Sequence, residues 1–135
     1  MEGHTIELRE DGRRIEISVG GVVVASTTRA ISLHETGLPP RSYVPCDDVR
    51  MELLDPTERS SACPFKGEAS YWSVEIDGVR HENIVWAYED PIEGMEAIAG
   101  RLAFFDERVD VVIDGEPQER PRTQWTPGAV PAEHP

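Results

Sequence analysis

Two reactive side chains lie three residues apart in the stretch SSACPFKGEASYW, residues 60–72. Cys63 carries a thiol, and Lys66 is the only lysine in a chain that has twelve arginines. A thiolate is a nucleophile, and a compact ammonium fits a small pocket where the fork of an arginine would need more room. Pro64 and Gly67 are typical of a turn. The stretch is therefore a reactive centre, a turn that holds a ligand, or a structural turn.

Each of the two side chains has two interpretations. Cys63 is either a small buried thiol that packs like alanine or an activated nucleophile, although no histidine lies near it in the sequence to serve as a base. Lys66 is either a solvated turn residue or a specific contact. The specific contact would be an anion or carbonyl in a cavity, or an ion pair with Glu35 or Asp48.

Aromatic residues with polar tips follow on two predicted strands. Trp86 and Tyr88 are two apart and therefore share a face, while Tyr71 shares its face with the small residues Ala69 and Ser73. Such rings line either an ordinary core or a cavity, and apolar walls with a few polar groups are typical of small-molecule sites. The candidate ligand-binding residues are Glu35, Tyr43, Cys63, Lys66, Tyr71, Trp86 and Tyr88.

Composition limits the classes of partner. The chain has 135 residues and a formal net charge of −13, which repels nucleic-acid backbones and anionic lipids. No apolar run approaches the ~18 residues of a membrane-spanning helix, and the N-terminus lacks a signal-peptide pattern. We therefore expect a cytoplasmic protein with reduced cysteines and neither nucleic-acid nor membrane partners. The four histidines have no metal-ligand spacing, so we expect no metal and no cofactor.

Short alternating segments separated by turn dipeptides predict an all-β fold. Strands are expected at residues 5–8, 14–19, 22–26, 30–35, 68–76 and 84–88, and a last hairpin at 101–105 and 109–113. Residues 36–45 contain three prolines and predict an irregular crossing. Short helical segments are expected at 47–54 and 92–99. The prediction is one domain, residues 1–115, of two antiparallel sheets, followed by a proline-rich tail at 116–135.

Four segments in order carry a resemblance to a known family. They are YVPCDDV, SACPFKGEASYWSV, VWAYEDP and IAGRLAFFDERVDVVIDG. Together they resemble the domain-of-unknown-function family 427 of bacteria and fungi, over about residues 16–115. The resemblance implies a small β-tent fold, in which two antiparallel sheets lean on each other like an open, barrel-like sandwich. Several β-tent proteins hold zinc through paired CxxC motifs, and this chain has none.

Three hypotheses of function follow. The first is a small-molecule-binding β domain with an aromatic-lined cavity between its sheets. The second is an enzyme that uses Cys63 or Lys66, in nucleotidyltransferase-like or thiol chemistry, although the chain lacks a Gly-rich phosphate-binding loop. The third is an interaction or oligomerisation module, suggested by strand edges and the tail. The expected partner is a small molecule, and the expected assembly is a monomer or weak homodimer.

Overall fold

The computed structural model describes residues 3–127, and these form an all-β fold, as predicted. The strands divide among three antiparallel sheets, one more than the two sheets expected. The first sheet contains β1 (Ile6–Asp11), β4 (Ala30–Glu35) and β5 (Arg41–Tyr43). The second contains β11 (Glu116–Pro117), β10 (Asp110–Ile113), β2 (Ile15–Val19) and β3 (Val22–Thr27). The third contains β6 (Leu54–Cys63), β7 (Gly67–Ile76), β8 (Val79–Ala87) and β9 (Ala103–Phe104).

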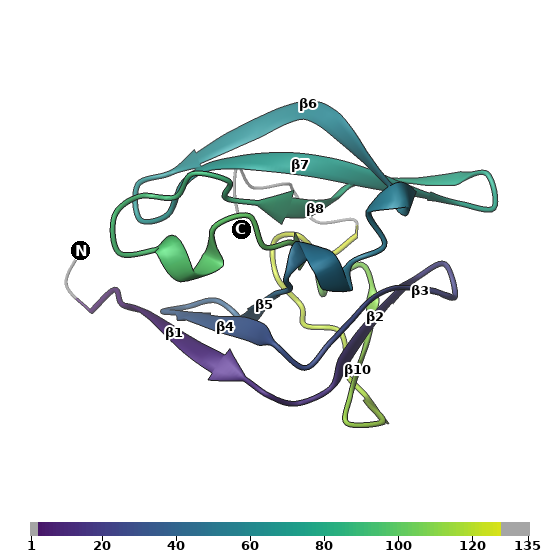
Figure 1. Ribbon diagram of the computed structural model, residues 1–135, viewed down its shortest axis with the longest axis horizontal. Coiled ribbons are helices and arrows are strands. Elements are labelled where there is room, and N and C mark those ends of the chain that lie inside the picture. The colour runs from purple at the N-terminus through teal and green to yellow at the C-terminus, as the bar shows by residue number, and fades with distance from the viewer. Residues whose placement is uncertain (1–2, 128–135) are drawn as a thin grey trace.

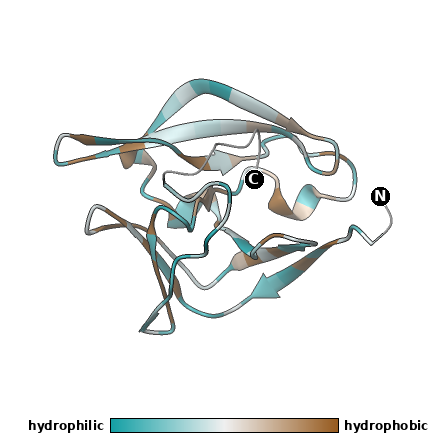
Figure 2. Cartoon of the chain, turned by 180° about the vertical axis from the view of Figure 1, so that it is seen from behind, coloured by the Kyte–Doolittle hydropathy of each residue, from teal (hydrophilic) through white to brown (hydrophobic). Residues whose placement is uncertain are grey.

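The sheets form two layers. The third sheet lies above the other two in Figure 1, and the first and second sheets together make the lower layer. Figure 2 shows hydrophilic colour on much of β1, in the lower layer, and on part of β6, in the upper one. Apolar side chains of both layers meet in the interior, where Ile17 of the lower layer and Val85 of the upper layer belong to one buried cluster, as the hydrophobic effect requires of sheets with one solvated face.

The interior divides into two groups of buried side chains. One is mainly aliphatic and contains Ile15, Ile17 and Val85 among others. The other is rich in aromatic rings, and we call it the aromatic cluster. Its buried members are Leu33, Tyr43, Cys63, Ala69, Tyr71, Trp86, Tyr88, Ile98, Ala103, Phe105 and Trp125.

Paired positive φ angles close the tight hairpins. Gly20 and Gly21 (56° and 83°) join β2 to β3, and Asp77 and Gly78 (50° and 79°) join β7 to β8. Two consecutive left-handed residues are the requirement of a type I′ turn, whose twist suits antiparallel strands. The strands predicted at residues 14–19 and 22–26 flank the first of these turns, whereas β8 begins at Val79, five residues before the strand predicted at 84–88.

The helix predicted at residues 47–54 is wrong as a continuous element. The segment makes two separate 3₁₀ turns, η1 (Cys46–Asp48) and η2 (Met51–Leu53), and the chain then enters β6 directly. The second expected helical segment is a single 3₁₀ turn, η3 (Glu96–Ile98). Within the described part of the chain, no helix has the length and apolar character needed to cross a membrane.

The last predicted hairpin is also wrong. β9 pairs with β8, whereas β10 pairs with β2, so the two segments belong to different sheets. The tail then begins as strand β11, which pairs with β10. Further along the tail, Trp125 is buried in the aromatic cluster. The tail as far as residue 127 thus packs against the body.

Candidate functional site

The turn between β6 and β7 places Lys66. The Lys66 amide donates a hydrogen bond to the Cys63 carbonyl (3.2 Å), and Cys63 pairs with Gly67 across the hairpin. Gly67 has a φ of +119°, and a Cβ there would lie 3.3 Å from Cα of Pro91. Only glycine tolerates that backbone without strain, and it also lets the chain at Pro91 approach closely. This fixed turn directs Lys66 inward, where its residue is only 2% exposed.

The ammonium of Lys66 forms a buried ion pair with Glu35, one of the two partners expected from the sequence. Nζ lies 2.6 Å from Oε1 of Glu35. Glu35 is the last residue of β4, and the β1–β4 pairing sets it opposite Ile6. The other expected partner, Asp48, instead accepts hydrogen bonds from Thr27 (2.7 Å) and Arg29 (3.2 Å).

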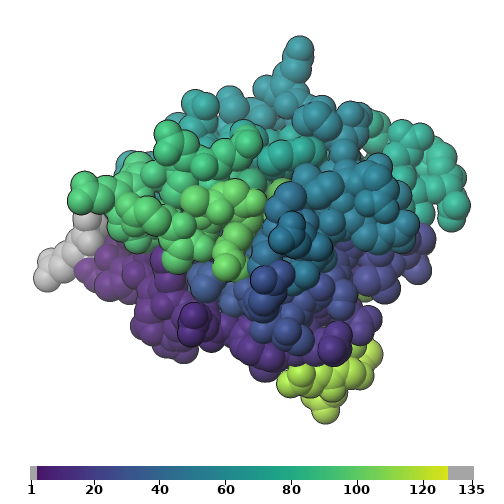
Figure 3. Space-filling model, in the orientation of Figure 1, coloured from purple at the N-terminus to yellow at the C-terminus, as the bar shows by residue number. Residues whose placement is uncertain are grey.

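His4 contacts this ion pair and stacks on Phe65. Nε2 of His4 lies 3.0 Å from Oε2 of Glu35, so Glu35 contacts both His4 and Lys66. The His4 ring also stacks on Phe65, with ring centroids 4.2 Å apart. The segment from about residue 90 to 100 (green) and the N-terminal strand (purple) lie near each other on the face seen in Figure 3. Sequence reasoning missed His4 because its partner is 31 residues away.

The aromatic cluster holds the remaining predicted site residues. Nε1 of Trp86 donates a hydrogen bond to the Tyr43 hydroxyl (3.1 Å), and the two rings meet edge to face. The Tyr71 hydroxyl shares a hydrogen bond with Ser61 Oγ (2.8 Å). Both phenols are therefore buried with a partner, as polar tips in a core require.

Tyr88 differs from these two phenols. Its residue is 0% exposed, and among residues 3–127 its hydroxyl has no hydrogen-bond partner. The ring lies 6.0 Å from Nζ of Lys66. Burial raises the pKa of Tyr88 far above its ordinary value, and the nearby acidic groups of Tyr43, Cys63, Tyr71 and Glu35 raise it further. The Tyr88 ring also lies 6.5 Å from the ring of Tyr43, so Tyr88 adjoins both Lys66 and the aromatic cluster.

Cys63 lies in the wall of the aromatic cluster. It is a free thiol, and its residue is 3% exposed. The structure thus brings all seven predicted residues together: five belong to the aromatic cluster, and Lys66 and Glu35 form the ion pair beside it. Within residues 3–127, no group of three His, Cys, Asp or Glu side chains is arranged to hold a metal ion.

A second buried ion pair, Arg41 with Glu107, adjoins the aromatic cluster and was not predicted. The Arg41 guanidinium donates two hydrogen bonds to the Glu107 carboxylate, at 2.7 and 2.8 Å. It also lies 5.6 Å from the ring centroids of Trp86 and Trp125. The hydroxyl of Thr123 donates to the same carboxylate. No local pattern indicates this pair, because its members are 66 residues apart.

The two acids of this region have opposite pKa shifts. Burial acts to raise the pKa of Glu107, but hydrogen bonds from Arg41 and Thr123 outweigh it and leave that pKa lowered. Asp106 lies 4.0 Å from Arg41, too far for a direct hydrogen bond. Burial therefore raises the pKa of Asp106 to about 7, against the opposing charge of Arg41.

The fold and these sites define a small all-β domain in which two buried ion pairs adjoin the aromatic cluster. Residues 7–115 match the family described as "Domain of unknown function (DUF427)". The match covers most of the chain, which therefore belongs to this family. No curated protein matches the chain.

Proposed function

We propose that the domain binds a small molecule at the predicted residues Glu35, Tyr43, Cys63, Lys66, Tyr71, Trp86 and Tyr88. The buried hydroxyl of Tyr88, which lacks a partner among the described residues, is the observation that carries this proposal. A buried polar group left without a hydrogen bond costs about 1–3 kcal/mol. An acceptor or donor on a ligand would remove that cost, which gives the site an intrinsic affinity for a polar atom at this position.

The charges around Tyr88 favour a neutral ligand. Lys66 and Glu35 offset each other, so the site as a whole carries no excess charge at neutral pH. A buried carboxylate or phosphate would bring an uncompensated charge into a low-dielectric interior, which is costly. A carbonyl oxygen accepts a hydrogen bond from Tyr88 without that penalty. The ligand class that fits best is therefore a small, uncharged carbonyl compound such as an amide.

Entry to the site requires movement of its cover. The site residues are almost fully buried, whereas Phe65, which stacks on His4, is 40% exposed. Displacing these two rings would uncover the Glu35 carboxylate and the ammonium paired with it. Such a contact between two side chains at the surface opens far more readily than a packed sheet.

NMR titration of the full-length protein with N-methylacetamide tests the proposal. Acetate and methylammonium, which are similar in size but charged, serve as comparison probes. We expect N-methylacetamide to shift the amide signals of the turn at Lys66 and of Tyr88 in the wild type. Tyr88→Phe should abolish this response, whereas Tyr71→Phe, which removes a hydroxyl already bonded to Ser61, should retain it. An equal response from Tyr88→Phe would contradict the proposal.

The enzyme alternative makes a different prediction about Cys63. A thiol mechanism needs a reactive, accessible thiolate, whereas a wall residue at 3% exposure should resist reagents until the protein unfolds. Alkylation by iodoacetamide across pH separates the two. Cys46, which is exposed, provides the internal control because it should react in the folded protein.

We also propose that the chain acts in the cytoplasm as a monomer or weak homodimer, without nucleic-acid or membrane partners. Its formal charge of −13 and its two free cysteines support this placement. Cell fractionation and light scattering of the full-length protein test it. A stable higher oligomer would instead favour the interaction module.

A further inference from the structure

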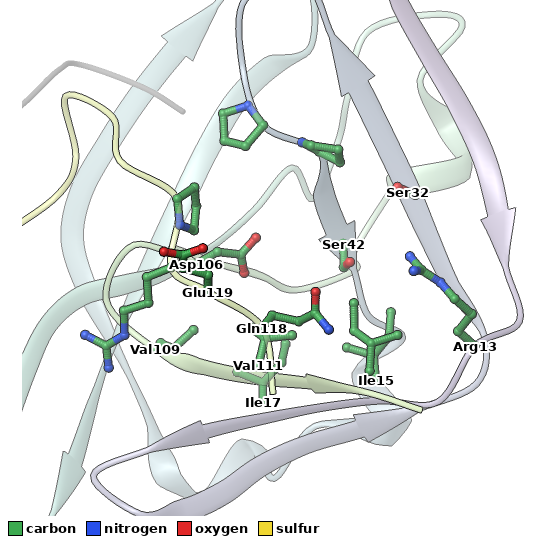
Figure 4. A pocket seen from close by; sticks show the side chains of 15 residues that line it. Arg13, Ile15, Ile17, Ser32, Ser42, Asp106, Val109, Val111, Gln118 and Glu119 are labelled. Carbon is green, nitrogen blue, oxygen red and sulfur yellow. The ribbon is translucent and has the colours of Figure 1, made fainter. Parts of the chain in front are cut away.

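A pocket of about 290 Å³ lies between the first and second sheets, and none of the seven predicted residues lines it. Figure 4 shows its apolar floor, with Ile15, Ile17, Val109 and Val111, and its acidic end, with Asp106. Arg13 lies at the opposite end of the pocket from Asp106 in this view. The volume is close to the lower limit of ~300 Å³ for ligand pockets, so it suits a small ligand.

The floor comes from two paired strands. Ile15 and Ile17 alternate on β2, and Val111 of β10 lies directly opposite Ile17 in the sheet. Residues two apart on a strand share a face, so these side chains form one continuous aliphatic surface. Such a surface binds a hydrocarbon body by excluding water and offers it no hydrogen bonds.

Asp106 is poorly neutralised by the protein itself. Arg41, the one cation within 4.0 Å of it among the described residues, is too far for a direct hydrogen bond, and its guanidinium instead donates to the Glu107 carboxylate through both terminal nitrogens. The side chain of Asp106 is 23% exposed, and it lines the pocket. Its carboxylate is thus available to a ligand.

The two arginines in the pocket wall are already paired with aspartates that do not line it. Arg13 donates to Asp11 through two hydrogen bonds, at 3.0 and 2.8 Å. Arg120 donates to Asp110 at 3.0 Å. These pairs leave little positive charge for an anionic ligand, and the overall charge of −13 opposes one as well.

We propose that this pocket binds a small organic cation, a protonated primary amine on an aliphatic body. The ammonium lies at Asp106, with Glu119 as a second acid in the pocket wall, and the aliphatic body lies on the floor of Ile15, Ile17 and Val111. An ammonium supplies three donors and a full positive charge, which is what an under-neutralised carboxylate lacks.

Binding of such a cation depends on pH. The ligand needs the ionised carboxylate, and the pKa of Asp106 is raised to about 7 by burial and by Glu107, with Arg41 opposing. The other charged groups that line the pocket are Arg13, Glu119 and Arg120. Apparent affinity scales with the ionised fraction, so it should rise about tenfold from pH 6 to pH 8.

Calorimetric titration of the full-length protein with n-butylamine at pH 6 and pH 8 tests this site. Butyrate and n-butanol serve as the anionic and neutral probes of the same length. We expect butylammonium alone to bind, about tenfold more tightly at pH 8. Asp106→Asn should abolish both the binding and its pH dependence. Asp55→Asn makes the same charge change on β6, away from the pocket, and should change neither.

A second variant separates loss of the carboxylate from loss of the fold. Val111→Phe fills the floor without altering charge, so it should also block butylammonium while circular dichroism reports an intact β fold. Binding of butyrate or butanol as tight as that of butylammonium would overturn the proposal. Undiminished binding to Asp106→Asn, or no binding of butylammonium to the folded wild type at pH 8, would overturn it equally.

Discussion

The ammonium nitrogen of Lys66 lies 2.6 Å from Oε1 of Glu35, and both side chains are almost completely removed from solvent. The only lysine of the chain is thus used as a buried charge. The pair adjoins an aromatic cluster in which the hydroxyl of Tyr88 lacks a partner among the described residues. Nε1 of Trp125 in the same cluster and Nε of the adjoining Arg41 also lack a partner among the described residues, and this combination of offset charges and unsatisfied polar atoms distinguishes the region from an ordinary core.

Removing one member of this ion pair should be strongly destabilising. Lys66→Met removes the ammonium from the buried Glu35 carboxylate, which keeps its contact with His4, and breaking a buried pair in this way costs about 3–5 kcal/mol. The double variant Glu35→Gln/Lys66→Met removes both charges and should recover part of the loss. Urea denaturation of the wild type, Lys66→Met and the double variant gives the free energy of unfolding of each.

The exposed pair of Arg80 and Asp55 provides a matched control. Arg80→Met should cost no more than about 1 kcal/mol, because water already solvates both charges. If Lys66→Met cost no more than this control, the ion pair would have no special role in the fold.

The turn that carries Lys66 should be intolerant of a side chain at Gly67. Gly67→Ala forces a φ near +119° on a residue with a Cβ and brings that atom to 3.3 Å from Pro91. Backbone strain of this kind costs about 1–3 kcal/mol, and the close contact adds to it. Thermal unfolding should show a clear loss of Tm. Gly12→Ala, at a site where a Cβ has no atom within 4 Å, should leave Tm nearly unchanged.

Asp106 should make the protein less stable as pH rises. Its pKa is raised from 3.8 to about 7 in the folded state, so the folded protein binds the proton more tightly than the unfolded chain does. The stabilisation from this proton is complete below pH 3.8 and is lost as pH rises through 7. Asp106→Asn should therefore be more stable than the wild type at pH 8, by at most about 4 kcal/mol.

Urea denaturation at pH 5 and pH 8 measures this effect. The increase in the free energy of unfolding caused by Asp106→Asn should be much smaller at pH 5, where the carboxyl of the folded wild type is already protonated. Asp55→Asn, at an exposed carboxylate, should show no such difference between the two pH values. A gain that is equal at both pH values would show that Asp106 titrates in its ordinary range.

The tail should contribute to the stability of the body. Trp125 is buried against Phe105, and its ring lies 5.6 Å from the guanidinium carbon of Arg41. Trp125→Ala should cost about 3–5 kcal/mol, as for other buried aromatic side chains. Trp125→Phe should cost less because it keeps most of the packing. If denaturation detected no loss for Trp125→Ala, the packing of Trp125 would contribute nothing to the stability of the body.

Local pattern was sufficient to predict the fold class and several strands. β4 was predicted with its full bounds, because alternating residues and flanking turns mark it clearly. β6 was missed because it is an edge strand whose side chains are largely polar and exposed. Pro56 is tolerated there because the β6–β7 pairing is interrupted after it.

Tertiary pairing explains where local pattern failed. The alternation predicted for β7 holds at Ala69 and Tyr71, but a register shift near Trp72 then leaves both Ser73 and Val74 buried. A bulge of this kind depends on the partner strand, which sequence periodicity does not reveal.

Several residues of the candidate site could be predicted from the sequence, whereas others could not. Lys66 was identified because it is unique in the chain, and Glu35 was named as one of its two possible partners. His4 lies 31 positions from its partner Glu35 in the sequence, and Arg41 lies 66 positions from Glu107. Only the tertiary fold brings these residues together, so local sequence patterns carry no signal for them.

Native mass spectrometry of the full-length protein, released from cells without denaturation, tests the central claim most directly. The wild type and Tyr71→Phe should both carry a small neutral adduct that dissociates on unfolding. Tyr88→Phe, which lacks the unsatisfied hydroxyl, should appear at the mass of the chain alone. An adduct that persists in Tyr88→Phe, or its absence from the wild type, would contradict a ligand site at Lys66 and Tyr88.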